Sequence, residues 1–231
     1  MYFKPIRYRT RSYLRDWYSY YIKYKLRSRI QLDSFSIVMR VPFGQMALIE
    51  YKIINKYELE IIEPEKAEKL LRLVYPWRRR EFKQYFKNNS VCLVGKKGDQ
   101  IVSYGWNSIG KVDPKIQREL DLNIPMGPKD IWGVDIVVAP PYRGRGVGFS
   151  AFQHVNDYWK AKGMEYLYDC VSVRNRGSLK LHKRVGFKPI YIHYLHRWFG
   201  FQKSNLMPID EHSISLANKA AKGINIGFLW K

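Results

Sequence analysis

The chain has 231 residues, of which 46% are apolar, and it carries a formal net charge of +21 at pH 7. Its length and apolar content favour one large domain, or an ordinary domain with appendages, and exclude a disordered chain. The charge favours anionic partners such as CoA, nucleic acid or lipid headgroups, whereas Cys92 and Cys170 lack the spacing of a metal or disulfide site.

Residues 1–30 concentrate basic and aromatic side chains. They hold nine Lys or Arg against the single Asp16, together with nine Tyr, Trp or Phe. From Ser12 onward the apolar side chains can be placed on one broad helical face. A helix of this composition can pack on the domain, lie in an anionic membrane interface or contact nucleic acid. We favour the first two alternatives and disfavour nucleic acid.

Strand signals precede the main domain. Residues 34–41 and 46–54 are strand-like and flank a Pro-Phe-Gly turn, so they predict a hairpin. The alternating run 57–62 predicts the first strand of the main domain. We therefore expect an N-terminal extension over residues 1–56 and a single domain over residues 57–231.

Helix and hairpin signals follow in the first half of that domain. Pro64 between two glutamates predicts a helix start, and residues 77–86 predict a second helix. Residues 91–94 and 101–109 flank a glycine-containing turn and predict a hairpin. The segment 110–129 contains three prolines and is longer than a usual connection, which predicts a functional loop.

The stretch 131–163 organises the rest of the chain. Residues 131–139 form an apolar, β-branched run that contains Asp135 and ends at two prolines, so they predict a buried strand. A turn with three glycines follows, and a helical apolar face begins at Val147. Strand, glycine turn and helix N-terminus form an anion cradle flanked by two arginines. The expected guest is a phosphate or pyrophosphate.

Further elements are expected after the cradle. Residues 166–173 predict a strand, residues 177–184 a helix and residues 187–198 another strand. In the tail, residues 214–221 are helix-like. The apolar run 224–230 would close the sheet as an edge strand.

Two motifs resemble those of one superfamily. Arg143, Gly146 and Gly148 form R-x-x-G-x-G after V-x-P-x-Y-R, which resembles the acyl-CoA-binding motif of the GNAT superfamily of N-acyltransferases. The segment from Asn175 to Phe187 resembles that superfamily's N-x-x-[AS]-x-x-L-Y-x-x-x-G-F. The resemblance implies an α/β (α+β) GNAT fold with a mixed, mostly antiparallel twisted sheet and helices on both faces. The N-terminal basic helix and hairpin would be additions to it.

The resemblance also implies a donor site for acetyl-CoA or another acyl-CoA, without a metal. Backbone groups of Ile136, Val137 and Val138 would pair with the pantetheine, and Asn175 and Ser178 would contact the CoA arm. The pyrophosphate would be wrapped by the six turn residues Arg143, Gly144, Arg145, Gly146, Val147 and Gly148. From the residues alone, Asn175 is also a turn former and Ser178 an N-terminal helix residue. Arg78, Arg79 and Arg80 could meet the CoA phosphates or form a solvated face.

His182 is the candidate proton donor. In many GNAT members this position is a tyrosine near the thioester sulfur, and a histidine can also give a proton near neutrality. The adjacent Lys183 and Arg184 disfavour its charged form. An ordinary packing or surface histidine is the alternative.

Asp135 is the candidate general base, because a carboxylate inside an apolar strand needs either a partner or a role. Strand alternation places it on the face of Gly133 and Val137. Glu60 and a base acting through a water chain are the alternatives.

We therefore expect an enzyme, an N-acetyltransferase that moves an acetyl or other acyl group directly from acyl-CoA to a primary amine. One alternative is a membrane-associated acyltransferase that takes longer acyl donors. Another is a CoA-binding or nucleic-acid-binding module on a GNAT fold without catalysis. We expect a cytoplasmic protein, with residues 1–30 as a means of peripheral contact with the inner membrane face. The acceptor is open, and a homodimer is compatible with the sequence.

Overall fold

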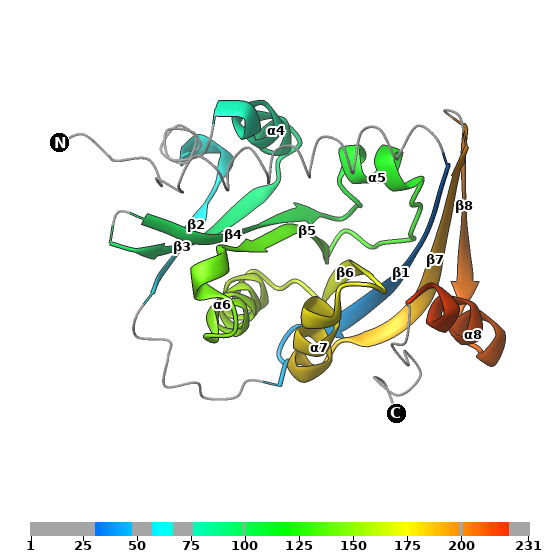
Figure 1. Cartoon of the computed structure of the whole chain (residues 1–231). Coiled ribbons are helices and arrows are strands. Elements are labelled where there is room, and N and C mark those ends of the chain that lie inside the picture. The colour runs from blue at the N-terminus through cyan, green and yellow to red at the C-terminus, as the bar shows by residue number, and fades with distance from the viewer. Residues whose placement is uncertain (1–30, 48–56, 67–75, 99, 199–200, 222–231) are drawn as a thin grey trace.

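The computed structural model of the chain describes residues 31–47, 57–66, 76–98, 100–198 and 201–221. In these residues the strands form one mixed sheet, flanked by helices, in the order β2-β3-β4-β5-β6-β1-β7-β8 (Figure 1). The strands are β1 (Gln31–Pro42), β2 (Glu58–Ile62), β3 (Val91–Lys97), β4 (Gln100–Ile109), β5 (Asp130–Val138), β6 (Tyr166–Ser172), β7 (Lys188–Trp198) and β8 (Phe201–Pro208). The helices are η3 (Pro64–Lys66), α4 (Pro76–Lys87), α5 (Pro114–Leu120), η4 (Pro140–Tyr142), α6 (Val147–Ala161), α7 (Arg176–Val185) and α8 (Glu211–Ala220).

The helices cover both faces of the sheet, which confirms the expected fold class. Helices α4 and α5 lie over one face, and α6 and α7 lie over the other (Figure 1). Residues of α4 pack around the fully buried Trp106, with the rings of Phe82, Tyr85 and Phe86 all centred within 4.9 Å of it. The apolar faces of α6, α7 and α8 share a second core on the opposite side. Each face of the sheet is therefore closed by an amphipathic layer.

The sheet opens between β5 and β6. These two strands are parallel, and their ladder covers only Asp130–Trp132 against Tyr166–Tyr168. The other strand pairs of the described sheet are antiparallel and longer. Beyond Trp132 and Tyr168 the two strands diverge, so one backbone edge of β5 has no ladder partner in the described part of the chain. This opening, which we call the V cleft, begins at Gly133 and Asp169.

The predicted N-terminal hairpin is wrong in its pairing. Strand β1 forms where residues 34–41 predicted one, but it lies inside the sheet, paired along one edge with β6 and along the other with β7. Both ladder edges of β1 are therefore occupied, and none is left for a hairpin partner. Most of the expected second strand, residues 46–54, lies outside the described residues. Strand β1 is thus part of the same sheet as residues 58–208.

The structure also contains two elements, α5 and β8, that the sequence did not predict. The segment 110–129 contains α5, whose N-terminus is capped by the Asp113 side chain through the backbone N–H groups of Lys115 and Ile116. Strand β8 was not predicted, because its residues lack an alternating apolar pattern, and five of its eight residues are exposed at the sheet edge. The helix expected to start at Pro64 is described only as the short η3 (Pro64–Lys66), and its continuation lies outside the described residues. The expected edge strand 224–230 and the basic helix of residues 1–30 also lie outside them.

The remaining predicted elements are confirmed, namely β2, α4, the β3–β4 hairpin, β5, α6, β6, α7, β7 and α8. Among the helices that the structure describes, none is both long and apolar enough to cross a bilayer.

Candidate functional site

Strand β5 contains a β-bulge at Asp135. Tyr104 pairs with Val137 and Trp106 pairs with Val134, so two residues of β5 face one residue of β4 between these pairs. Asp135 has a φ of 51°, which side-chain-bearing residues rarely adopt. A bulge adds one residue and interrupts the alternation of side chains along the strand. The carboxylate of Asp135 consequently points to α4, where it meets Arg78.

The expectation that Asp135 shares a face with Gly133 is therefore wrong. Gly133 lines a pocket under α6, on the opposite face of the sheet. Val134 is buried in the core beneath α4, and the bulge places Asp135 next to it on that same face. Simple alternation fails here because the extra residue shifts every later side chain of the strand.

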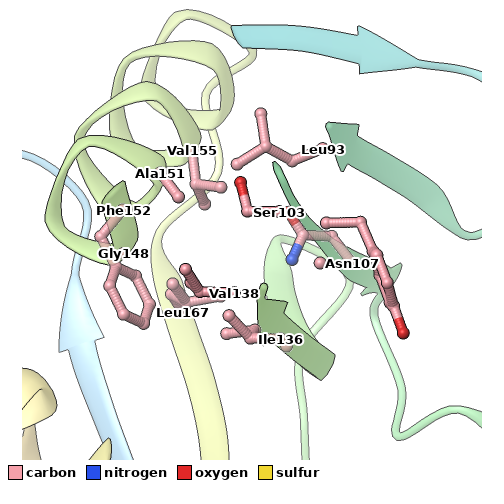
Figure 2. A pocket seen from close by; sticks show the side chains of 13 residues that line it. Leu93, Ser103, Asn107, Ile136, Val138, Gly148, Ala151, Phe152, Val155 and Leu167 are labelled. Carbon is pink, nitrogen blue, oxygen red and sulfur yellow. The ribbon is translucent and has the colours of Figure 1, made fainter. Parts of the chain in front are cut away.

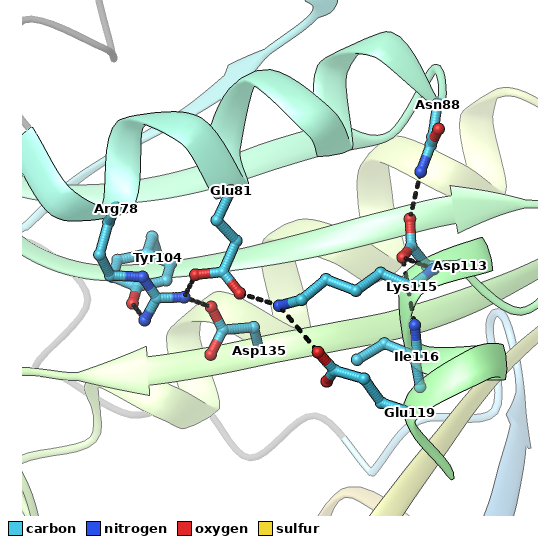
Figure 3. A network of polar contacts seen from close by, with 9 residues as sticks. All are labelled: Arg78, Glu81, Asn88, Tyr104, Asp113, Lys115, Ile116, Glu119 and Asp135. Carbon is cyan, nitrogen blue, oxygen red and sulfur yellow. Dashed lines mark hydrogen bonds and ion pairs between the residues drawn. The ribbon is translucent and has the colours of Figure 1, made fainter. Parts of the chain in front are cut away.

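Arg78 binds three partners beneath α4 (Figure 3). Its Nη1 donates to the Tyr104 hydroxyl at 2.7 Å, and its Nη2 donates to Asp135 and lies 2.7 Å from Glu81. The Arg78 side chain is only 14% exposed, so it does not form a solvated face. Its partners lie on β4, β5 and α4, and not in the glycine turn before α6. Arg79 and Arg80 are exposed. The guanidinium thus joins α4 to the bulge of β5.

The polar network continues from Arg78 to α5. Lys115 forms an ion pair with Glu81 and lies 3.8 Å from Glu119, and the network therefore spans α4, β5 and α5 (Figure 3). The 110–129 segment is in this way tied to the face of the sheet that carries Asp135.

Burial shifts the pKa values of both members of the Arg78–Asp135 ion pair. Burial raises the pKa of Asp135 to about 6, against the opposing effect of the Arg78 charge. Burial lowers the pKa of Arg78, but the Asp135 carboxylate and other neighbours outweigh it, so the net direction is upward. Arg78 therefore stays charged, and Asp135 gains or loses its proton at a pH of about 6. The Asp135 side chain is 24% exposed, which leaves it within reach of solvent.

Glu60, the alternative base, forms an ion pair with Lys96 on the neighbouring strand. It lies on β2, an edge strand separated from β5 by β3 and β4. The structure does not bring Glu60 and the bulge together.

The glycine turn forms the predicted cradle geometry. Gly144 and Gly146 have φ values of 71° and 83°, and Gly146 is the N-cap of α6. No side chain of the described residues caps this helix, and the first intrahelical bond runs from the Ser150 N–H to the Gly146 carbonyl. The amide groups of the first turn are thus available to an anion at the positive end of the helix dipole.

The apolar pocket under α6 lies directly beside this cradle. Figure 2 shows side chains of α6, β3, β4, β5 and β6 converging on it. Gly148 lets α6 approach α7, because a Cβ at Gly148 would lie 2.9 Å from Leu181. Ile136 is 39% exposed although it lines the pocket, which therefore opens toward the V cleft.

The backbone of β5 offers two of the three residues expected to meet the pantetheine. Val137 pairs with Tyr104, and the Ala139 N–H donates to the Val102 carbonyl, so both face β4. By alternation Val138 faces the V cleft, and its carbonyl accepts a 2.9 Å bond from Arg143 Nε. Ile136 lies two residues before it on the same edge. The side chain of Arg143 is thus held on β5.

Asn175 and Ser178 both have structural partners at the start of α7. Asn175 is the N-cap, and its side-chain oxygen accepts from the Ser178 N–H at 3.2 Å. The Ser178 hydroxyl lies 3.3 Å from His182 Nδ1. Both residues therefore have the helix-start role that the sequence left open, and the Asn175 side chain is exposed.

His182 is buried and bonded through both ring nitrogens. Its Nδ1 lies 2.7 Å from the Ser178 carbonyl oxygen, and its Nε2 lies 2.8 Å from Asp169 Oδ2. Asp169 is a partner that sequence reasoning missed. A carboxylate within an apolar strand run, the signal that singled out Asp135, is present at Asp169 as well.

Comparisons with known proteins agree with this arrangement. The family model described as "Acetyltransferase (GNAT) family" matches residues 54–187. An uncharacterized N-acetyltransferase of Methanocaldococcus jannaschii is 24% identical over 160 residues, which are 62% of this chain and 65% of that protein. The GCN5-related glucosamine N-acetyltransferase region of a fungal multi-domain β-N-acetylglucosaminidase has the same fold. Its TM-score is 0.52 at 16% identity, over 83% of this chain and 23% of that one.

The glycine cradle, the bulged strand and the V cleft all lie within residues 54–187, which match the acetyltransferase family model. The fold and the site are therefore those of an acetyltransferase. The chain belongs to the GNAT acetyltransferase family.

Proposed function

We propose that the chain is an acyl-CoA-dependent N-acetyltransferase that moves an acetyl group directly to a primary amine. The observation that carries the proposal is the uncapped N-terminus of α6, behind two left-handed glycines and beside the free edge of β5. A pyrophosphate fits the first feature and an extended amide-bearing arm fits the second. Membership of an acetyltransferase family supports the same reading.

The donor fits residues of this chain. The first-turn amides of α6 and the exposed side chain of Arg145 would hold the pyrophosphate, and backbone groups of Ile136 and Val138 would hold the pantetheine. Arg143 Nε donates a hydrogen bond to the Val138 carbonyl, so it would share or release that bond when the pantetheine is bound. When bound, acyl-CoA supplies the activated acyl group. The chain supplies orientation and proton transfer.

The acceptor amine would approach Asp135 from the face of α4 and α5. The network there holds three carboxylates, those of Asp135, Glu81 and Glu119, against the two cations Arg78 and Lys115. Its net charge is therefore negative when all five groups are ionised, which favours an ammonium group in an otherwise basic protein. Asp135 would take the proton that the amine must lose before it attacks.

The direct test is an acyl-transfer assay. The purified chain is incubated with acetyl-CoA and a panel of amines, amino sugars and peptides, while free CoA thiol and the mass of each acceptor are followed. We expect stoichiometric thiol release and acetylated product with at least one acceptor class. Acetyl-CoA binding by calorimetry without transfer to any acceptor would favour a binding module instead.

The pH dependence tests the role of Asp135. Since burial raises its pKa to about 6, kcat/KM for the acceptor should rise as the pH increases through about 6, where the carboxylate becomes able to accept a proton. Asp135→Asn should lower kcat by roughly 100-fold or more and remove this limb of the profile. Glu60→Gln serves as the control and should leave the profile unchanged. Loss of activity in Glu60→Gln with a normal Asp135→Asn would reverse the assignment.

A peripheral membrane role of residues 1–30 stays a prediction. This segment joins β1 at Gln31, which lies opposite Trp198, and Trp198 and Phe201 are 53% and 77% exposed. Nine cations would each contribute about 1 kcal/mol near an anionic surface. We expect the full chain to co-sediment with anionic vesicles at low salt and less at high salt, while a chain beginning at Leu32 stays in solution. Equal binding to neutral and anionic vesicles would contradict this role.

A further inference from the structure

The hydrogen bonds of His182 indicate how many protons the ring and Asp169 hold together. A carbonyl oxygen can only accept, so Nδ1, at 2.7 Å from the Ser178 carbonyl, must carry a hydrogen. A second proton must lie between Nε2 and Asp169 Oδ2, which are 2.8 Å apart, because two bare acceptors would repel each other at that distance. The pair therefore holds one proton more than a neutral imidazole and a carboxylate together.

Both carboxylate oxygens of Asp169 have hydrogen-bond partners. Its other oxygen, Oδ1, accepts from the Cys170 N–H at 2.7 Å. Asp169 is 7% exposed and His182 is 2% exposed. The rings of Phe152 and Phe187 enclose the imidazole at centroid distances of 5.1 and 4.7 Å. In such apolar surroundings a charged imidazole needs a fixed counter-charge.

The other ionisable groups near the pair do not compete for its proton. Burial, together with the Asp169 charge, raises the pKa of the Cys170 thiol to about 12, so this thiol stays protonated. Lys183 and Arg184 follow His182 on α7 and are exposed to solvent. Asp169 is thus the group that determines the charge of the ring.

The pair lies at the closed end of the V cleft. The β5–β6 ladder stops at Trp132 and Tyr168, and Gly133 and Asp169 are the next residues of the two strands. A Cβ at Gly133 would lie 3.3 Å from Asp169 Oδ2, so a larger residue there would press on the carboxylate. Gly133 also lines the pocket under α6 together with Ile136 and Val138, whose backbone edge faces the cleft. The shared proton is therefore close to the space proposed for the thioester.

We propose that Asp169 is a positioning residue that holds His182 with a proton on each ring nitrogen, so that this pair supplies the proton taken up by the departing CoA thiolate. The proposal rests on the proposed acetyl transfer. The amine nitrogen forms a bond to the acyl carbon and loses its second proton to solvent, the carbon–sulfur bond breaks, and the thiolate sulfur takes the Nε2 proton. A neutral imidazole with its Nδ1 hydrogen and an ionised Asp169 remain, and solvent returns one proton before the next turnover.

The test compares Asp169→Asn in two backgrounds. Asparagine keeps the size and a hydrogen bond to Nε2 but removes the charge, so the ring can become neutral. We expect kcat to fall by about 10- to 100-fold with KM for acetyl-CoA unchanged. In His182→Tyr, which places the residue of many GNAT members at this position, the phenol carries its own proton. Adding Asp169→Asn to that variant should then change kcat by less than about 3-fold.

A second readout does not depend on turnover. Nitrogen-15 NMR of ring-labelled protein should show both ring nitrogens of His182 protonated at neutral pH in the parent and only one in Asp169→Asn. A neutral ring in the parent overturns the proposal, as does a kcat of Asp169→Asn equal to that of the parent. Equal losses in the histidine and tyrosine backgrounds would reduce Asp169 to a structural role. A parent chain without acetyl transfer overturns the proposed function and this step together, whereas an active parent with an unaffected Asp169→Asn overturns this step alone.

Discussion

Gly146→Glu is expected to abolish measurable binding of acetyl-CoA. Gly146 is the N-cap of α6, and the substitution would place a carboxylate where the first-turn amides are available to the pyrophosphate. The new side chain would use those amides itself and repel the ligand. Losing two or three charge-assisted contacts at about 1.5 kcal/mol each corresponds to a loss of affinity of 100-fold or more.

Gly163→Glu is the matched control for this variant. It lies just beyond the other end of α6, and its φ of 73° is close to the 83° of Gly146. Both substitutions therefore force an ordinary residue into the left-handed region, at a cost of about 1–2 kcal/mol of stability, and both add one negative charge. Only Gly146→Glu should lose acetyl-CoA affinity in calorimetry. Equal affinity in the two variants and the parent would remove the donor site from α6.

The cradle was predictable because its signal is local. Two prolines, three glycines and the apolar face that begins at Val147 fall within one short stretch, and each residue acts on its own backbone or on its own helix. The same holds for α4 and α7, whose boundaries follow from apolar periodicity and caps such as Asn175. Local chemistry of this kind is visible in a sequence without knowledge of the partners.

The features that the sequence did not predict depend on residues distant in the chain. The position of β1 between β6 and β7 is set by pairing over more than 100 residues, and its own pattern is that of any buried strand. The bulge at Asp135 lies opposite Gly105 of β4, where a Cβ would come within 3.3 Å of Ile136. The sequence leaves open whether Arg78 is solvated or meets the CoA phosphates, because nothing in α4 shows that its partner is a carboxylate on β5. Alternation and helical periodicity carry no information of this kind.

Arg78→Leu is expected to destabilise the protein by about 3–5 kcal/mol at pH 8, because it leaves the Asp135 carboxylate buried without its counter-charge. The loss should be smaller at pH 5. Asp135 already has a folded-state pKa of about 6, above its ordinary value of 3.8, so its contribution to stability falls as the pH rises through this range. Without Arg78 the carboxyl would bind its proton more tightly still and would be neutral in the folded protein at pH 5. Urea denaturation at both pH values measures the difference.

The double variant Arg78→Leu/Asp135→Leu separates this pairing from simple loss of packing. Neither charge remains buried in it, so at pH 8 it should recover most of the stability that Arg78→Leu loses, although Glu81 keeps only Lys115 among the partners drawn in Figure 3. Arg79→Leu changes an exposed neighbour on the same helix and should stay within about 0.5 kcal/mol of the parent. If Arg78→Leu lost the same stability at pH 5 and pH 8, or if the double variant were no more stable than the single one, then Arg78 would act through packing and hydrogen bonds to Tyr104, and Asp135 would not depend on it for its charge.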